Sequence, residues 1–184
     1  MPDPISRALA DAVLAWGPDA PAIVRDALSL VAQFGIYLAV LLVVVGAWLA
    51  GSRTIEGFVM AILPGLIAAA IAIVVVRMIG GLFPVPRPFV ASGLVPLFAH
   101  SADPSLPSDH VTVGMAMLGA RIEDRRIRWA TALVVLLVGL ARVLAGVHWL
   151  DDIVLGALIG LACAWLGRLT WIAIVGRRRA GLAG

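Results

Sequence analysis

Long apolar runs are the feature that most constrains the fold of this 184-residue chain. A helix needs about 20 apolar residues to cross a bilayer, and hydrophobic residues make up 62% of the sequence while charged residues make up 14%. We expect about five membrane-spanning helices. They cover residues 27–50, 57–82, 108–121, 129–147 and 152–175. The sequence therefore predicts an all-α integral membrane protein, a helix bundle folded as a single domain over residues 1–184.

The two ends of the chain have a different character from the spans. Residues 1–26 are expected to lie on the membrane surface, because residues 4–16 place apolar side chains near helical spacing opposite Arg7 and Asp11. Such an amphipathic pattern is typical of an interfacial helix. Residues 176–184 are expected to form a basic tail.

All 14 basic side chains are arginines, and their distribution predicts the orientation. With five spans, residues 51–56, residues 121–128 and the C-terminal tail share one side, which carries eight arginines, while the other side carries three. Because cytoplasmic loops are enriched in positive charge, we expect the arginine-rich side to face the cytoplasm. The net charge of +3 does not indicate a nucleic-acid partner, since the arginines lie at the ends of apolar runs.

Three short polar segments interrupt the apolar sequence, and all are expected on the outer side. They are residues 85–88, residues 107–110 and residues 141–152. They contain two of the three histidines and two arginines suited to binding phosphate. Segments on one side of the membrane can meet in space, so the sequence predicts an outward-facing site.

The third segment supplies a candidate nucleophile and its partner. A neutral imidazole at His148 could attack phosphorus and form a covalent intermediate. Asp152, four residues later, could accept a hydrogen bond from the other ring nitrogen and fix the tautomer. His110 could then act as general acid toward the leaving oxygen.

The remaining polar residues predict a phosphate cradle. Arg87 and Arg142 offer planar donors to phosphate oxygens, and Ser108 opens a helix whose free backbone amides favour anions. Asp109, Asp151 and Asp152 could be imagined as metal ligands, but two converging arginines argue against a cation site. We therefore expect no metal and no cofactor.

Each of these residues also has a purely structural interpretation. His148 beside a tryptophan could be an interfacial side chain, and Arg77 or Arg142 could extend to the membrane surface. Ser108 and Asp109 could serve only as helix N-caps. The functional interpretation rests on all three segments falling on one side with complementary chemistry.

The motifs resemble those of the type 2 phosphatidic acid phosphatase superfamily. The superfamily pattern is Lys, six residues, Arg-Pro, then Pro-Ser-Gly-His, then Ser-Arg, five residues, His, three residues, Asp. This chain matches it with Arg87-Pro88, Pro107-Ser108-Asp109-His110, and Arg142, His148 and Asp152 at the full spacing. It departs where Gly80 replaces the lysine, Asp109 the glycine and Ala141 the serine. Arg77 lies one helical turn before Gly80 and could take over the lysine's phosphate contact.

The small size and residues 82–90 are closest to one branch, the bacterial undecaprenyl-diphosphate phosphatases of the bacitracin-resistance type. The resemblance implies a membrane helix bundle that hydrolyses a polyprenyl diphosphate outside the cytoplasm without a metal. It also implies the residue roles. His148 is then the nucleophile, Asp152 the residue that orients it, and His110 the acid. The phosphate is held by Arg87, Ser108, Asp109 (through its amide) and Arg142. We add Arg77 and His100 as candidate additional phosphate contacts.

Two alternatives stay open at this point. The chain could act on other lipid phosphates, such as phosphatidate, phosphatidylglycerol phosphate or lipid A. It could instead transport an anion or a lipid along a path lined by arginine and histidine. A transporter more commonly shows inverted repeats and broken helices in matching halves, and the sequence contains neither pattern.

Overall fold

The structure, a computed structural model, describes residues 2–181, with side chains described to residue 177. The described part of the chain is helical and holds seven α-helices. They are α1 (Pro4–Trp16), α2 (Ala22–Ala50), α3 (Ile55–Leu82), α4 (Pro88–Ser92), α5 (Asp109–Ala116), α6 (Arg125–Leu144) and α7 (Leu150–Gly181), with 3-10 turns at Gly17–Asp19 and Met117–Gly119. The all-α prediction is confirmed.

Four helices, α2, α3, α6 and α7, are long and apolar enough to cross a membrane. They correspond to four of the expected spans, with shifted ends. Helix α2 starts within the region expected at the membrane surface, and α7 continues as helix through residues 176–181 of the expected basic tail. Residues 182–184 of that tail lie outside the described residues.

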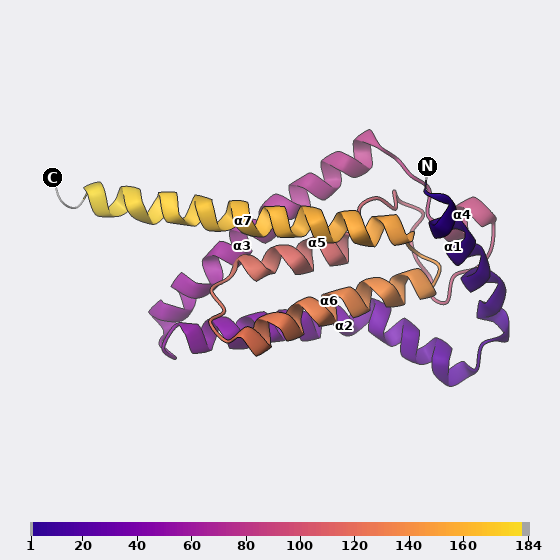
Figure 1. Ribbon diagram of the computed structural model, residues 1–184, viewed down its shortest axis with the longest axis horizontal. Coiled ribbons are helices and arrows are strands. Elements are labelled where there is room, and N and C mark those ends of the chain that lie inside the picture. The colour runs from indigo at the N-terminus through magenta and orange to yellow at the C-terminus, as the bar shows by residue number, and fades with distance from the viewer. Residues whose placement is uncertain (1, 182–184) are drawn as a thin grey trace.

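The third expected span, residues 108–121, is a short helix in the middle of the bundle. Helix α5 has 8 residues, about 12 Å at 1.5 Å per residue, and the following 3-10 turn and coil carry the chain to the far end. There the Arg121 backbone N–H donates to the carbonyl of Ala61 at 2.8 Å. Figure 1 shows α5 enclosed between α3, α6 and α7. The chain thus passes from one end of the bundle to the other at this point without a full-length helix.

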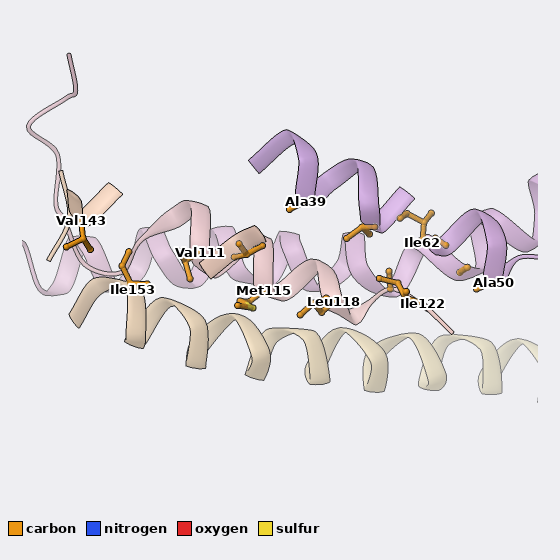
Figure 2. Close-up of a cluster of buried hydrophobic side chains, with 14 residues drawn as sticks. Ala39, Ala50, Ile62, Val111, Met115, Leu118, Ile122, Val143 and Ile153 are labelled. Atoms are coloured by element: carbon orange, nitrogen blue, oxygen red, sulfur yellow. The ribbon is translucent and has the colours of Figure 1, made fainter. Parts of the chain in front are cut away.

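Close packing of small residues encloses α5. A Cβ atom on Gly160 of α7 would lie 2.4 Å from the Thr112 carbonyl oxygen, and one on Gly114 would lie 2.8 Å from Val135. Figure 2 shows the resulting core, a row of buried side chains that follows α5 and includes Val111 and Met115. Because backbone approaches this close require glycine, these positions fix how deeply α5 sits.

Helix α1 lies across one end of the bundle (Figure 1). The Asp3 carboxylate caps it, accepting from the backbone N–H groups of Ile5 and Ser6 at 2.7 and 3.1 Å. The Ser6 hydroxyl donates to Asp151 at 2.8 Å, which ties α1 to the start of α7. The expected helix over 4–16 is confirmed, while its place on the membrane surface stays a prediction, as does the assignment of residues 1–184 to one domain.

Candidate active site

The turn between α6 and α7 positions His148. Gly146 has a φ of 75°, a left-handed conformation that favours glycine, and a Cβ there would lie 2.4 Å from the Leu14 side chain of α1. This turn brings His148 into the interior, where it is 1% exposed. It is among the largest fully buried side chains of the described residues, so it is not an interfacial side chain.

The hydrogen bonds of His148 define its tautomer. Its Nε2 lies 3.1 Å from the Arg87 guanidinium, and its Nδ1 lies 3.1 Å from Oδ2 of Asp152. Because arginine only donates, Nε2 accepts and the proton of the neutral ring is on Nδ1, where it is donated to Asp152. The lone pair of Nε2 is therefore directed at the guanidinium of Arg87.

Asp152 is held by more than the histidine. Its Oδ2 accepts from the backbone N–H of Trp149 at 2.8 Å and from the hydroxyl of Ser105. Burial is the main cause that lowers the pKa of His148 to about 4; the hydrogen bond to Asp152 opposes it, and the charges of Arg142 and Arg87 add to it. The imidazole is thus neutral near pH 7, the state that a nitrogen nucleophile requires.

Arg87, 3% exposed, lies at the start of α4 and is fixed on several sides. One of its terminal nitrogens donates to the Val147 carbonyl at 2.9 Å as well as to His148. Its Nε donates to the Asp103 carbonyl at 3.1 Å, and the Asp103 carboxylate forms an ion pair with its other terminal nitrogen at 3.1 Å. These contacts join the loop before α5 to the turn that holds His148.

Arg142 projects from the last turn of α6 and is 2% exposed. It donates to the Ala32 carbonyl of α2 at 3.1 Å and to Nε2 of His100 at 2.7 Å. The ring of His100 in turn donates from Nδ1 to the carbonyl of Ser101 at 3.0 Å. His100 therefore orients Arg142 in this structure and presents no donor of its own toward the site.

Two buried polar atoms near these side chains have no partner within the described residues. They are the Nε of Arg142 and the hydroxyl of Ser108, a residue that is 0% exposed. The backbone of Ser108 is held by its N–H, which donates to the Asp152 carbonyl at 3.1 Å. Since buried polar groups are almost always hydrogen-bonded, the two unpartnered donors indicate a place for an anionic ligand.

His110 and Asp109 lie in the first turn of α5. Nδ1 of His110 lies 3.0 Å from the carboxylate of Asp109, which also accepts the His110 backbone N–H at 2.9 Å. His110 faces a pocket of about 500 Å³ bounded by α2, α3, α5 and the loop before α5. Arg77 and Arg87 line the same pocket, together with apolar residues such as Ile73.

The expected site residues thus fall into two adjoining groups joined by Arg87. Arg87, Ser108, Arg142, His148 and Asp152 are buried together behind the loop, whereas Arg77, Asp109 and His110 face the pocket. The sequence interpretation missed Asp103 and Ser105, which hold Arg87 and Asp152. Both lie in the irregular loop over 83–107, where no spacing relates them to the motifs.

The described residues contain no group of three or more His, Cys, Asp or Glu side chains that could hold a metal ion. The positive charge of the site comes from the guanidinium groups of Arg87 and Arg142. Guanidinium groups bind phosphate oxygens with two parallel hydrogen bonds. The donor set is therefore suited to a phosphate anion.

Comparison with known proteins assigns the family. A sequence model of the PAP2 superfamily matches residues 61–175, more than half of the chain, and the match includes the three polar segments. The chain belongs to the PAP2 superfamily.

Two curated relatives share part of the chain. Undecaprenyl-diphosphatase BcrC of Bacillus subtilis (strain 168) is 43% identical over 75 residues, which are 40% of this chain and 38% of that protein. The putative undecaprenyl-diphosphatase YbjG of Escherichia coli (strain K12) is 37% identical over 110 residues, 59% of this chain and 56% of that protein. The match therefore spans less than two thirds of either relative.

Solved structures share the fold. Aquifex aeolicus LpxE superposes with a TM-score of 0.65 and 22% identity, covering 85% of this chain and 92% of that one. A transmembrane PAP2-type phosphatidylglycerolphosphate phosphatase from Bacillus subtilis superposes with a TM-score of 0.63 and 18% identity, covering 89% and 83%. The fold is that of a transmembrane PAP2 protein, and the chain is a multi-pass membrane protein.

Proposed function

We propose that this protein is a membrane phosphatase that hydrolyses undecaprenyl diphosphate to undecaprenyl phosphate and inorganic phosphate, and so recycles the lipid carrier of cell-wall precursors. The observation that carries the proposal is the buried His148, whose Nδ1 is bonded to Asp152 and whose Nε2 faces Arg87. The two named undecaprenyl-diphosphatase relatives support the choice of substrate.

In the proposed first step, Nε2 of His148 attacks the terminal phosphorus. The bond between that phosphorus and the bridging oxygen breaks, and His110 donates a proton to the departing undecaprenyl phosphate. Asp152 stays ionised, accepts a hydrogen bond from Nδ1–H throughout, and stabilises the positive charge that develops on the ring.

In the second step, water attacks the phosphohistidine. His110, now deprotonated, accepts a proton from this water, the bond between phosphorus and Nε2 breaks, and inorganic phosphate leaves. Both residues return to their starting protonation states, so the cycle consumes one water and balances without an added reactant.

The proposed cradle stabilises the phosphoryl group during both steps. Arg142 and Ser108 each contribute a buried donor that has no partner within the described residues, and the amide of Asp109 at the start of α5 adds to them. Arg87, next to His148, contributes a further guanidinium to the same phosphate. Arg142 is fixed before the substrate arrives by its bonds to Ala32 and His100, and donors fixed in this way need no reorganisation in the transition state.

The pocket suits a substrate that stays in the membrane. The Ser108 backbone N–H donates to the Asp152 carbonyl, and the Ser108 carbonyl lies beside Gly156 of α7. Helix α5 therefore starts at least one helical turn, about 5 Å, deeper in the bundle than the first residue of α7. A diphosphate presented from within the leaflet can reach this depth while its tail lies between α2 and α3. The arginine distribution supports a site facing the periplasm or the outside.

The test compares substrates with the purified protein in detergent. Phosphate release from undecaprenyl diphosphate should exceed release from phosphatidate at matched surface concentration, and soluble monoesters should be hydrolysed far more slowly. The His148→Ala variant should lose both turnover and any acid-labile phosphoenzyme. Equal or faster turnover of phosphatidate would replace the proposed substrate, and no phosphate release from any lipid would favour a transporter.

A further inference from the structure

A second pocket lies at the opposite end of the bundle from the candidate active site. It has a volume of about 490 Å³ and is bounded by α5, α6 and α7. Its charged lining residues are Arg128 and Arg168, its aromatic ones are Trp129 and Trp165, and no acidic residue lines it. Figure 1 shows α6 and α7 diverging toward this end, with α5 between them. The pocket is thus positively charged and open between two membrane-spanning helices.

Arg168 of α7 turns into the protein instead of extending along the membrane surface. Its Nε donates to the Gly119 carbonyl at 3.0 Å, and one terminal nitrogen donates to Leu118 and Ala120 at 2.9 and 3.3 Å. These carbonyls end the turn that follows α5. The contacts fix the guanidinium at the pocket wall and leave its second terminal nitrogen without a bond to the described residues.

Arg128 in the first turn of α6 carries the second charge. One of its terminal nitrogens donates to the Ile122 carbonyl, but its Nε is buried and has no partner within the described residues. The neighbouring acids are engaged elsewhere. Asp124 accepts from the Arg126 backbone N–H at 2.7 Å, and Glu123 pairs with the exposed side chain of Arg121 at 3.5 Å.

The depth of the pocket corresponds to the opposite membrane boundary. Arg168 follows Leu150 by 18 helical residues, about 27 Å at 1.5 Å per residue, and the hydrocarbon core is about 30 Å thick. Trp129 and Trp165 are exposed beside the arginines, and tryptophans gather where hydrocarbon meets headgroups. The two guanidiniums therefore lie at the level of lipid phosphates.

We propose that this pocket binds an anionic phospholipid of the leaflet opposite the candidate active site. The phosphodiester accepts from the terminal nitrogen of Arg128 and of Arg168 that makes no bond to the described residues, and an acyl chain lies along the apolar wall that includes Leu136 and Leu161. Basic pockets between membrane helices bind such headgroups, and a lipid occupies both the charged and the apolar part of this one. The proposal is independent of the phosphatase reaction.

The experiment measures binding of brominated lipids by the quenching of tryptophan fluorescence in phosphatidylcholine bilayers. Brominated phosphatidylglycerol should bind the wild-type protein more tightly than brominated phosphatidylcholine. Arg128→Gln should lower this preference about tenfold, because a charge-assisted hydrogen bond is worth about 1.5–3 kcal/mol. Arg126→Gln removes the same charge from the exposed surface of the same turn and should keep the wild-type preference.

A second variant guards against a folding defect. Ala132→Phe fills the pocket while both arginines remain, and it should also abolish the preference for phosphatidylglycerol. The proposal is overturned if Arg128→Gln and Arg126→Gln behave alike, or if Ala132→Phe retains the preference. It is also overturned if dissolved inorganic phosphate displaces the lipid, since the site would then recognise a soluble anion.

Discussion

Replacing Asp152 with asparagine tests the arrangement around the proposed nucleophile. One oxygen of Asp152 accepts from three groups, the Ser105 hydroxyl, His148 Nδ1 and the Trp149 backbone N–H. An asparagine can place its single acceptor oxygen where Oδ2 lies and keep these three donors, but it carries no charge. The positive charge that develops on the ring during the proposed attack then has no carboxylate beside it.

The expected loss is large. Two unit charges about 4 Å apart attract by about 4 kcal/mol at an effective dielectric constant of about 20, so losing the attraction between carboxylate and charged ring corresponds to about 10³-fold in rate. We expect a loss of that order for Asp152→Asn. Exchanging three charge-assisted hydrogen bonds for neutral ones costs about 1 kcal/mol each, so the variant should also unfold at a lower temperature.

The assay is the initial rate of phosphate release from undecaprenyl diphosphate in detergent, with folding checked by thermal unfolding. Ser105→Ala is the matched control, because it removes one donor but leaves the carboxylate and the tautomer intact. Loss of one of the three hydrogen bonds to the carboxylate, about 1.5 kcal/mol, should slow the reaction about tenfold, well short of the loss expected for Asp152→Asn. If Asp152→Asn remains folded and as active as Ser105→Ala, the proposed role of Asp152 is wrong.

Three further predictions concern the turn, the ionisation of the site and metals. Gly146→Ala should lower the unfolding free energy by about 1–3 kcal/mol, because Gly146 has a positive φ and a Cβ there would collide with the Leu14 side chain. Gly81→Ala is the control, since a Cβ on Gly81 meets open space, and it should leave thermal unfolding nearly unchanged. Burial lowers the folded pKa of His148 to about 4, below the unfolded value of about 6.5. The contribution of this residue to stability is therefore complete above about pH 6.5 and is lost as the pH falls toward 4. A titration of the His148 ring near pH 6.5, measured by NMR, would contradict the burial argument. Phosphate release should survive EDTA, since guanidiniums supply the positive charge that a metal would otherwise bring, and restoration of lost activity by divalent ions would count against this.

The sequence predicted the features that depend on local spacing. Hydropathy located the four long helices with their ends within six residues, because each must present about 20 apolar residues to lipid. The separation of four residues between His148 and Asp152 predicted their contact, since the turn before α7 brings such positions onto one side. The sequence also indicated that the three polar segments can meet, and in the structure Arg87 bonds Val147 and Ser108 bonds Asp152, while the roles of these residues stay predictions.

What the sequence could not predict depends on long-range packing. Residues 108–121 were predicted to span the membrane, but the helix ends at Ala116. The turn that follows packs tightly on α7, where a Cβ on Gly119 would lie 3.1 Å from the Ala164 carbonyl oxygen. Likewise, the helix over residues 4–16 was predicted from its amphipathic spacing alone, which did not indicate that Val13 and Leu14 are buried against the protein. Ser105 supports Asp152 from 47 positions away, and no periodicity encodes such a contact.

The resting geometry places a guanidinium where phosphorus must arrive. Arg87 donates to Nε2 of His148 and to the Val147 carbonyl, so the lone pair needed for the proposed attack is covered before substrate binds. A diphosphate offers the same guanidinium anionic acceptors, which attract its positive charge more strongly than the neutral imidazole and carbonyl do. Transfer of Arg87 from His148 to the phosphate is therefore favourable, and it uncovers the nucleophile only when a phosphate is there to be attacked. In the proposed mechanism, the ion pair with Asp103 would hold the guanidinium close during this exchange, a contact that no motif indicated.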